Sequence, residues 1–561
     1  MTDKLVIALA QLNPTVGDIA GNLARLRDAR AEAAAGGADL LVASELFLIG
    51  YPPEDLVLKP QFLAEVREAT EALAKDTADG GPAVLLGLPW REDGATGPLR
   101  HQVYNAVALL DGGAITGLRY KVDLPNYGVF DEKRVFKAGP LPGPINFRGV
   151  RLGVPICEDI WTEEVCECLG ESGAEILIVP NGSPYEMDKP DERMQYAVAR
   201  VTETGLPMIY VNQVGGQDEL VFDGASFVLD AERQLRAQLP LFEEAVTLTH
   251  WRRGADHTWT CEAAALTPPE NGMEPVYRAL TLGLRDYVNK NRFPGVIIGL
   301  SGGIDSALSA AVATDAIGPE RVHCVMMPSP YTSRESLDDA AQTAELLGVQ
   351  LDTVSIEPAM RAFNDMLAPV FDGREPDITE ENIQSRSRGL TLMAISNKLG
   401  HMVLSTGNKS EMSVGYATLY GDMCGGYNVL KDVYKTTVYQ LSRWRNQAHP
   451  KGAFGPAGRV IPERILTKAP TAELKPDQTD QDSLPPYADL DDILTCLIEQ
   501  EMGVDEIAAR GHDRATVNRV WRMLENAEYK RRQAPPGVKI TTRAFGRDRR
   551  YPITNAFKGP L

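Results

Sequence analysis

Residues 296–313, VIIGLSGGIDSALSAAVA, constrain the fold of the second half of this chain more than any other stretch. A short apolar run enters a loop of serine, glycine and aspartate, and an alanine-rich segment follows. A buried strand that passes through a glycine turn into a helix is the repeating unit of a parallel sheet. Further apolar runs at 321–329 and 351–358 supply more strands, so we expect a parallel sheet with covering helices.

The loop of this unit has the properties of an anion site. Gly302 and Gly303 can take up positive φ, which lets successive backbone N–H groups point into one concavity at the start of a helix. A nucleotide loop of the G-x-x-x-x-G-K-[ST] type also carries a lysine, and this one does not. It offers Asp305 between two serines instead, and a carboxylate beside phosphates is favourable when a divalent cation lies between them. The loop is therefore suited to magnesium pyrophosphate.

The first half of the chain reads as a separate, sheet-rich α/β domain. The pair Gly112–Gly113 predicts a hairpin, and residues 22–37 and 194–205 read as helices that end at glycine. Buried strands are predicted within 4–12, 39–47, 83–90, 105–110, 150–159, 175–183 and 207–216. The aperiodic, proline-containing segment after Cys261 predicts a linker. We therefore expect domains at 1–260 and 274–561, joined by a linker at 261–273.

Composition narrows the class of protein. At 561 residues the chain is too long for a single core. A formal charge of −20 argues against a nucleic-acid partner, and no apolar stretch approaches the eighteen or so residues of a membrane span. The beginning of the sequence lacks the basic region of a signal peptide, and seven scattered cysteines fit a reducing compartment. We expect an acidic cytoplasmic protein without a nucleic-acid or membrane partner.

The motif Ser-Gly-Gly-x-Asp-Ser at 301–306 resembles the pyrophosphate loop of the ATP pyrophosphatases. That family splits ATP between its α- and β-phosphates and attaches AMP to an oxygen of the acceptor. Segments 381–400, 405–422 and 530–553 are similar to NAD synthetases, which amidate the nicotinate carboxylate of deamido-NAD+. The resemblance implies a Rossmann-like domain whose ATP-binding residues are Gly299, Leu300, Ser301, Gly302, Gly303, Ile304, Asp305, Ser306 and Thr406.

The same resemblance assigns the acceptor site. It implies that deamido-NAD+ is bound by Asn382, Arg386, Glu411 and Lys530, and that Mg²⁺ is held by Asp305 and Glu411. The residue pattern agrees, because Asn382 and Arg386 are spaced i, i+4 and share one face of a predicted helix. Thr406 and Glu411 follow an apolar run at a predicted strand end, where α/β sheets place their sites. The sequence Cys-Gly-Gly at 424–426 departs from the family pattern.

In three segments of the first half, an apolar run is followed by a reactive side chain: Glu45, Lys121 and Cys157. They resemble the Glu–Lys–Cys triad of the nitrilase, or carbon–nitrogen hydrolase, superfamily. Covalent amide hydrolysis needs a nucleophile, a base for its proton and a cation for the oxyanion, and these residue types supply them. We expect Cys157 to attack, Glu45 to act as base, and Lys121 to stabilise the intermediate and help lower the thiol pKa. Glu132 is a candidate second acid.

The segments KVDLPNYGVFDEKRVF and VPNGSPYEMDK are similar to the glutaminase domain of the glutamine-dependent NAD+ synthetase family. The resemblance implies an αββα nitrilase sandwich in which Tyr127, Ser183 and Lys189 hold L-glutamine. It also implies a ligase that uses ATP, deamido-NAD+ and glutamine, passes ammonia through a protein-lined tunnel, and forms a homodimer or larger homo-oligomer.

The sequence disfavours two alternative functions. Another ATP-pyrophosphatase amidotransferase, making GMP or asparagine, is disfavoured because residue 2 is threonine rather than a nucleophilic cysteine, and no Cys/His/Glu glutaminase pattern is present. A synthetase fused to an inactive nitrilase-like module is disfavoured because Glu45, Lys121 and Cys157 are all intact.

Overall fold

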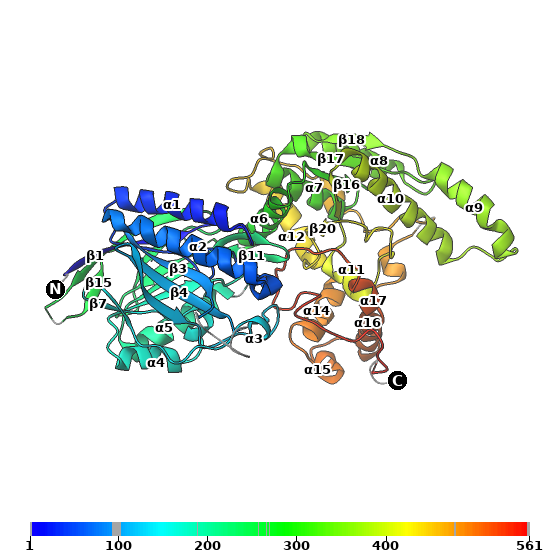
Figure 1. The fold of residues 1–561 in the computed structure, drawn as a ribbon. Coiled ribbons are helices and arrows are strands. Elements are labelled where there is room, and N and C mark those ends of the chain that lie inside the picture. Colours follow the sequence, from blue (N-terminus) through cyan, green and yellow to red (C-terminus); the bar gives the residue numbers. More distant parts are fainter. Residues whose placement is uncertain are drawn as a thin grey trace. The chain divides into compact units, whose positions relative to one another are not determined.

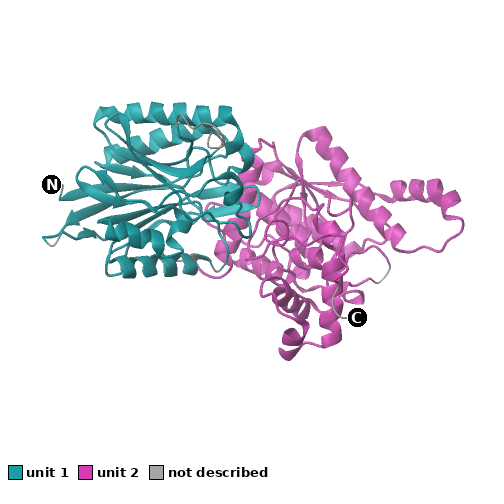
Figure 2. Cartoon of the chain, turned by 60° about the horizontal axis from the view of Figure 1, so that its bottom comes forward, with its two compact units in different colours: residues 1–270 teal, residues 271–561 magenta. Residues whose placement is uncertain are grey.

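A computed structural model describes residues 3–92, 102–187, 189–255, 257–264, 266–268, 270–475 and 478–557. The chain forms two compact units, Met1–Glu270 and Asn271–Leu561 (Figure 2). Within the described residues, no helix combines the length and the apolar character that crossing a bilayer requires.

The first unit contains two large sheets and a hairpin. One sheet has the order β15-β14-β1-β2-β3-β4-β5, the other has the order β13-β12-β9-β8-β7-β6, and β10 pairs with β11. The strands are β1 (Lys4–Gln11), β2 (Leu40–Val42), β3 (Ala83–Trp90), β4 (Tyr104–Asp111), β5 (Ala114–Tyr120), β6 (Ile145–Phe147), β7 (Val150–Gly153), β8 (Ile176–Asn181), β9 (Met208–Asn212), β10 (Val214–Gln217), β11 (Leu220–Asp223), β12 (Phe227–Leu229), β13 (Leu235–Gln238), β14 (Ala245–Arg253) and β15 (Trp259–Cys261). The helices are α1 (Ile19–Ala35), α2 (Pro60–Asp76), α3 (Glu132–Val135), α4 (Glu164–Glu171) and α5 (Lys189–Thr204).

Side-chain alternation along β1 explains why these elements stack in layers. Leu5, Ile7 and Leu9 belong to a buried cluster that also contains side chains of β7, β8 and β9, so this face packs against the second sheet. Ala8 and Ala10 point the other way, into a cluster with α1 and α2. A further cluster joins β8 and β9 to α4 and α5, which lie on the opposite side of the unit (Figure 1). The expected αββα sandwich is confirmed.

The predicted hairpin at Gly112–Gly113 is confirmed as well. Strands β4 and β5 pair antiparallel, with Asp111 opposite Ala114, so that the two glycines form the turn. Their φ values of 59° and 91° lie in the left-handed region, which two-residue hairpin turns require and which glycine adopts without a steric cost.

The second unit is built on a parallel sheet with the strand order β18-β17-β16-β19-β20. Its strands are β16 (Val296–Gly299), β17 (Val322–Met326), β18 (Gln350–Thr353), β19 (Met402–Ser405) and β20 (Tyr427–Asn428). Its helices are α6 (Met273–Lys290), α7 (Ile304–Ile317), α8 (Arg334–Leu347), α9 (Glu357–Phe371), α10 (Ile378–Leu399), α11 (Lys409–Val414), α12 (Lys435–Gln447), α13 (Glu463–Thr467), α14 (Tyr487–Ile498), α15 (Val504–Ala509), α16 (Arg514–Asn526) and α17 (Glu528–Arg531).

The strand order confirms the expected Rossmann-like sheet and locates its crevice. Successive strands run outward from β16 on one side and then resume at β19 on the other, so the order reverses between these two strands. Ligands of open α/β sheets bind outside the carboxyl ends of the strands at such a reversal. Here the two loops at that point are 300–303, which leads into α7, and 406–408, which leads into α11.

Gly302 is required by the geometry of the first of these loops. Its φ of +78° is left-handed, and a Cβ built on it would lie 2.3 Å from the carbonyl oxygen of Ser336. Since no side chain fits there, the loop can pass close beside α8 only with glycine at this position.

A buried ion pair stabilises the second unit. Asp315 of α7 accepts hydrogen bonds from Arg445 Nε at 2.6 Å and Nη2 at 3.0 Å, and from Tyr277 Oη at 2.6 Å. Both charged side chains are fully buried. Replacing Asp315 by alanine leaves the guanidinium without its counter-charge, and we expect a loss of about 3–5 kcal/mol in the free energy of unfolding of this unit.

Urea unfolding followed by circular dichroism measures that loss. The matched control is Asp505→Ala, which removes an exposed carboxylate 2.6 Å from Arg514 Nη1 and should change stability by less than about 1 kcal/mol. An effect of Asp315→Ala no larger than that of the control would contradict the role given to the buried pair.

Candidate active sites

In the first unit a buried charged cluster lies at the ends of three strands. Glu45 follows β2, Lys121 follows β5, and Cys157 opens the short 3₁₀-helix η4 (Cys157–Ile160) after β7. Lys121 Nζ lies 2.7 Å from Glu45 Oε1 and 2.8 Å from Glu132 Oε1. Glu45 and Lys121 are fully buried, and their charges both act on the pKa of the Cys157 thiol. The residues predicted as a triad are therefore together.

Both carboxylates of this cluster are held by further donors. Glu45 accepts hydrogen bonds from Asn105 Nδ2 at 2.7 Å and from the backbone N–H of Gly182 at 2.9 Å. Glu132 accepts one from Tyr51 Oη at 2.8 Å and a longer one from Asn105 Nδ2 at 3.3 Å. Asn105 thus bridges the two carboxylates, a role that its place in a predicted strand did not suggest. These bonds fix both acids relative to the lysine.

Lys121 acts on the pKa of the thiol in the expected direction but does not determine the net shift. Burial raises the pKa of Cys157 above its ordinary value, the charge of Glu45 raises it further, and Lys121 opposes both without cancelling them. The lowering contribution expected from Lys121 is therefore present, and the burial of the thiol outweighs it. The thiol is protonated at neutral pH and needs a base, and Glu45 is the carboxylate beside it.

Two of the three side chains predicted to bind glutamine, Tyr127 and Lys189, interact with Glu158, a carboxylate that the sequence did not indicate. Half-exposed Tyr127 donates to Glu158 Oε1 at 2.9 Å, and the charge of Lys189 acts on the pKa of Glu158. Burial raises that pKa, while Lys121, Tyr127 and Lys189 oppose the shift. The signal available in the sequence was an acid directly after the nucleophile. Ser183 is buried and accepts from Arg193 Nε at 3.0 Å.

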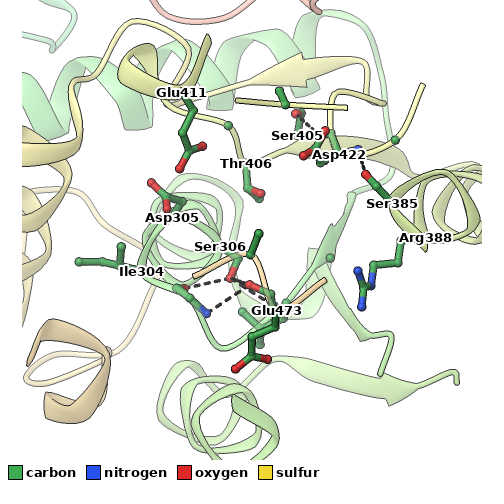
Figure 3. Close-up of a pocket in the computed structure, with 18 of the residues that line it drawn as sticks. Ile304, Asp305, Ser306, Ser385, Arg388, Ser405, Thr406, Glu411, Asp422 and Glu473 are labelled. Carbon is green, nitrogen blue, oxygen red and sulfur yellow. Dashed lines mark hydrogen bonds between the residues drawn. The ribbon is translucent and has the colours of Figure 1, made fainter. Parts of the chain in front are cut away.

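In the second unit a cavity of about 290 Å³ opens at the strand-order reversal (Figure 3). Its lining includes nearly all of the residues predicted for ATP and metal: Gly299, Leu300, Ser301, Gly303, Ile304, Asp305, Ser306, Thr406 and Glu411. Gly302 is absent from the lining, since its backbone faces α8. The hydroxyl oxygens of Ser301 and Ser306 lie 3.1 Å apart, and Gly303 N–H donates to Ser301 Oγ at 3.2 Å.

Lys435 at the start of α12 brings an ammonium group into this cavity. Its Nζ lies 2.5 Å from Asp305 Oδ2 and 3.1 Å from Glu411 Oε1, and Figure 3 shows these two carboxylates pointing toward each other. Burial raises the pKa of Glu411 to about 7, against the opposing charge of Lys435. The glycine loop lacks a lysine, as the sequence analysis noted, but the cavity does not. Nothing in the motif could reveal a lysine 130 positions further along the chain.

The residues of this cavity fit a magnesium nucleotide better than a free metal ion. Among the described residues, no group of three or more histidine, cysteine, aspartate or glutamate side chains is arranged to hold a metal. Asp305 and Glu411 nevertheless converge on one cation, the Lys435 ammonium. Because Mg²⁺ in nucleotide sites takes one or two carboxylates and completes its shell with phosphate and water oxygens, two carboxylates are the donor set expected for it.

Three residues predicted to bind deamido-NAD+ do not line the cavity but contact a segment beside it. Asn382 Oδ1 accepts from Thr418 Oγ1 at 3.1 Å, and Arg386 Nε donates to the carbonyl of Leu419 at 3.2 Å. Lys530 Nζ donates to the carbonyls of Gly415 and Ala417 at 2.7 and 2.6 Å. All three hold the segment 415–419, whose members Tyr416 and Ala417 do line the cavity. Their contact with the dinucleotide stays a prediction.

Arg388 and Asp422 are among the charged cavity residues that the sequence motifs did not indicate. Arg388 donates from Nε to the carbonyl of Met327 at 3.1 Å, and Asp422 accepts from the backbone N–H of Thr418 at 2.7 Å (Figure 3). Burial raises the pKa of Asp422 to about 6. Arg388 lies two residues beyond Arg386 in α10, so the two side chains leave the helix on different faces, and the sequence alone did not show which arginine faces the cavity.

Comparison with known proteins assigns each unit to a class. The carbon-nitrogen hydrolase family matches residues 6–254, and the NAD synthase family matches residues 276–534. The chain thus joins an amide-hydrolysing type of unit, with its buried Glu–Lys–Cys cluster, to an NAD synthase unit with its nucleotide cavity.

Full-length relatives define the family. A glutamine-dependent NAD+ synthetase of Rhodobacter capsulatus is 52% identical over 558 residues, and one of Thermotoga maritima is 47% identical over 590 residues, each covering 100% of both chains. The solved structure of a glutamine-dependent NAD+ synthetase from Acinetobacter baumannii in complex with ADP has a TM-score of 0.78 at 41% identity, covering 98% of this chain and 99% of that one. This chain belongs to the glutamine-dependent NAD+ synthetase family.

Proposed function

We propose that the chain converts ATP, deamido-NAD+, glutamine and water into AMP, pyrophosphate, NAD+ and glutamate. The observation that carries this proposal is the presence, in one chain, of a buried Glu–Lys–Cys cluster in one unit and a Ser-Gly-Gly-x-Asp-Ser nucleotide cavity in the other. Family membership over the full length supports the same pairing of activities. Hydrolysing glutamine supplies the reaction with neutral ammonia, which is the nucleophilic form, whereas ammonia in water at neutral pH is mostly protonated.

In the first unit, Cys157 Sγ attacks the carboxamide carbon of glutamine while Glu45 takes the thiol proton. The Lys121 ammonium, kept charged because the charges of Glu132 and Glu45 outweigh the effect of burial, stabilises the tetrahedral oxyanion. Collapse of the intermediate returns the proton to the leaving nitrogen and releases ammonia, leaving a thioester. Water, deprotonated by Glu45, then hydrolyses the thioester to glutamate and the free thiol. Tyr127, Ser183 and Lys189 are proposed to hold the amino-acid part of the substrate.

In the second unit, an oxygen of the nicotinate carboxylate attacks the α-phosphorus of ATP, and pyrophosphate leaves. The loop 301–306 and the Lys435 ammonium are proposed to bind the departing pyrophosphate. Mg²⁺, when bound by Asp305 and Glu411, would neutralise phosphate charge. Ammonia then attacks the carbonyl carbon of the adenylate, loses a proton, and displaces AMP to give the amide. Asn382, Arg386 and Lys530 are proposed to order the acceptor through the segment 415–419.

Product analysis tests this reaction. Purified protein given ATP, glutamine and deamido-NAD+ should yield AMP, glutamate and NAD+, and supplying xanthosine monophosphate in place of deamido-NAD+ should yield no amidated product. Formation of ADP instead of AMP, or amidation of xanthosine monophosphate alone, would contradict the proposal.

We further propose that the chain works as a homo-oligomer in the cytoplasm. None of its seven cysteines is in a disulfide, as a reducing compartment requires. Helix α9 has no buried residue, and it exposes Met366 and Val370 by 62% and 73%. Neighbouring α10 adds exposed Leu390 and Leu399. An apolar surface of this kind on two adjacent helices is suited to a second copy of the chain.

Light scattering after size exclusion tests the oligomer. The wild-type protein should have a mass of at least two 61.2 kDa chains, and Met366→Glu/Val370→Glu should shift it toward one chain. Asn364→Glu, an exposed polar position of the same helix, is the control and should leave the mass unchanged. A monomeric wild type, or a double variant of unaltered mass, would count against this interface.

A further inference from the structure

One buried carboxylate joins the chain segments that carry Lys121 and Cys157. Asp159 Oδ1 accepts hydrogen bonds from the backbone N–H groups of Val122 at 3.0 Å and Asp123 at 2.8 Å. Its other oxygen, Oδ2, accepts from the N–H of Ile156 at 2.9 Å. The side chain of Asp159 is 1% exposed. These bonds therefore form away from competing water, where a fixed geometry is most strongly maintained.

The bonded atoms are the immediate neighbours of both reacting side chains. Val122 directly follows Lys121 at the point where the chain leaves β5, and Ile156 directly precedes Cys157. Cys157 itself has a φ of +48°, a left-handed conformation that is unfavourable for a residue with a side chain and persists only when its surroundings impose it. Asp159 lies two residues beyond this position in η4, so its bond to Ile156 closes the turn that contains the nucleophile.

We propose that Asp159 is a positioning residue of the glutaminase site, which sets the placement of the Lys121 ammonium relative to Cys157 Sγ. This inference rests on the proposed hydrolysis of glutamine at Cys157. The oxyanion forms on the carbon that Cys157 attacks, so its stabilisation by Lys121 depends on how the two segments lie relative to each other. One carboxylate bound to both segments fixes that relation, and no contact between Asp159 and the substrate is required.

Asp123 provides a matched comparison in the same place. Its Oδ2 accepts from Thr162 Oγ1 at 2.9 Å, so it also connects the segment after Lys121 to the segment after η4. That bond, however, lies at the surface and involves a side-chain hydroxyl rather than the backbone next to the nucleophile. Asp123→Asn and Asp159→Asn make the same chemical change on neighbouring segments, and only the second puts an amide N–H group against a buried backbone donor.

Steady-state kinetics on the full-length protein test the proposal. Asp159→Asn should lower kcat for glutamine-supported NAD+ formation by about 100-fold while KM for glutamine changes by less than about threefold, since substrate contacts are kept. NAD+ formation from ammonium chloride should be unchanged. Asp123→Asn should behave as wild type in both assays. Equal kcat values for the two variants, or a rise in KM without a fall in kcat, would overturn the assignment.

Alkylation with iodoacetamide, followed by mass spectrometry of the cysteine peptides, separates positioning from loss of structure. In Asp159→Asn, Cys157 should still react fully but more slowly, while buried Cys166 of the same unit stays protected. If Cys166 of Asp159→Asn reacts rapidly, that variant has unfolded, and the same measurements are made on Asp159→Glu. A fall in kcat with Cys166 protected supports the positioning role. A wild-type kcat, or a Cys166 that also reacts rapidly in Asp159→Glu, overturns it. Glutamine-supported synthesis that survives Cys157→Ala would instead refute the proposed glutaminase itself.

Discussion

Cys157→Ala should reduce glutamine-supported NAD+ synthesis by at least about 1,000-fold, because no thioester can form without the nucleophile. Synthesis supported by ammonium chloride should continue at the wild-type rate, since the residues proposed to support adenylation belong to the other compact unit. Glutamate and NAD+ measured in the same reaction check both statements. The retained ammonia-supported activity also shows that the variant chain has folded.

Cys168→Ala is the control for this substitution. Cys168 is a partly exposed thiol of the same unit, and its removal should leave both activities near wild type. A Cys157→Ala variant that still forms glutamate from glutamine would show that another group is the nucleophile. Equal loss of both activities would show that Cys157 is needed for the fold, and the proposed role would fail.

Asp305→Asn should have a comparable effect on the second half-reaction. Adenylation of deamido-NAD+ is expected to fall by about 1,000-fold with either nitrogen donor, because the variant loses one of the two carboxylates proposed to hold Mg²⁺. The variant also removes one of the two carboxylates that pair with the buried Lys435 ammonium, so that Glu411 remains. Production of AMP measures adenylation, and release of glutamate in the absence of ATP measures the glutaminase, which should persist.

Asp489→Asn serves as the control, since Asp489 is an exposed carboxylate of the same unit and should not affect AMP formation. Magnesium titration adds a second reading, in which Asp305→Asn should need a higher concentration of the ion to reach half of its maximal rate. Unchanged AMP formation in Asp305→Asn would remove Asp305 from the proposed metal site.

Several strands that are buried on both faces were predictable from apolar runs in the sequence. The runs that became β1, β3, β8 and β9 are largely apolar, and burial explains why. The short buried strands β11 and β12 were not predicted. Strand β14, with the sequence AVTLTHWRR, was missed because only two of its nine positions are buried and five carry polar side chains. Its partner is β1, more than 230 residues earlier, so only the folded chain reveals the pairing.

The site residues fall into the same two groups: those that a local sequence pattern indicates, and those that only the folded chain reveals. Some site residues belong to short contiguous motifs whose chemistry can be predicted from the sequence: Glu45, Lys121, Cys157 and the loop 301–306. Asn105 and Lys435 gain their roles from contacts with residues 60 and 130 positions away, and a local pattern cannot encode such a contact. The net shift in the pKa of Cys157 could not be predicted for a related reason. The sequence showed which charges were available but not how deeply the thiol would be buried.

The division of the chain into two units after Glu270 has a consequence for the cell as well as for the reaction. Both units come from a single translation event, so every ribosome that completes the chain makes one nitrogen-releasing centre and one nitrogen-consuming centre. Gene dosage, promoter strength and messenger lifetime then change the amount of both together and never their ratio. Separate subunits would need matched expression to reach the balance that this covalent continuity provides at any level of synthesis.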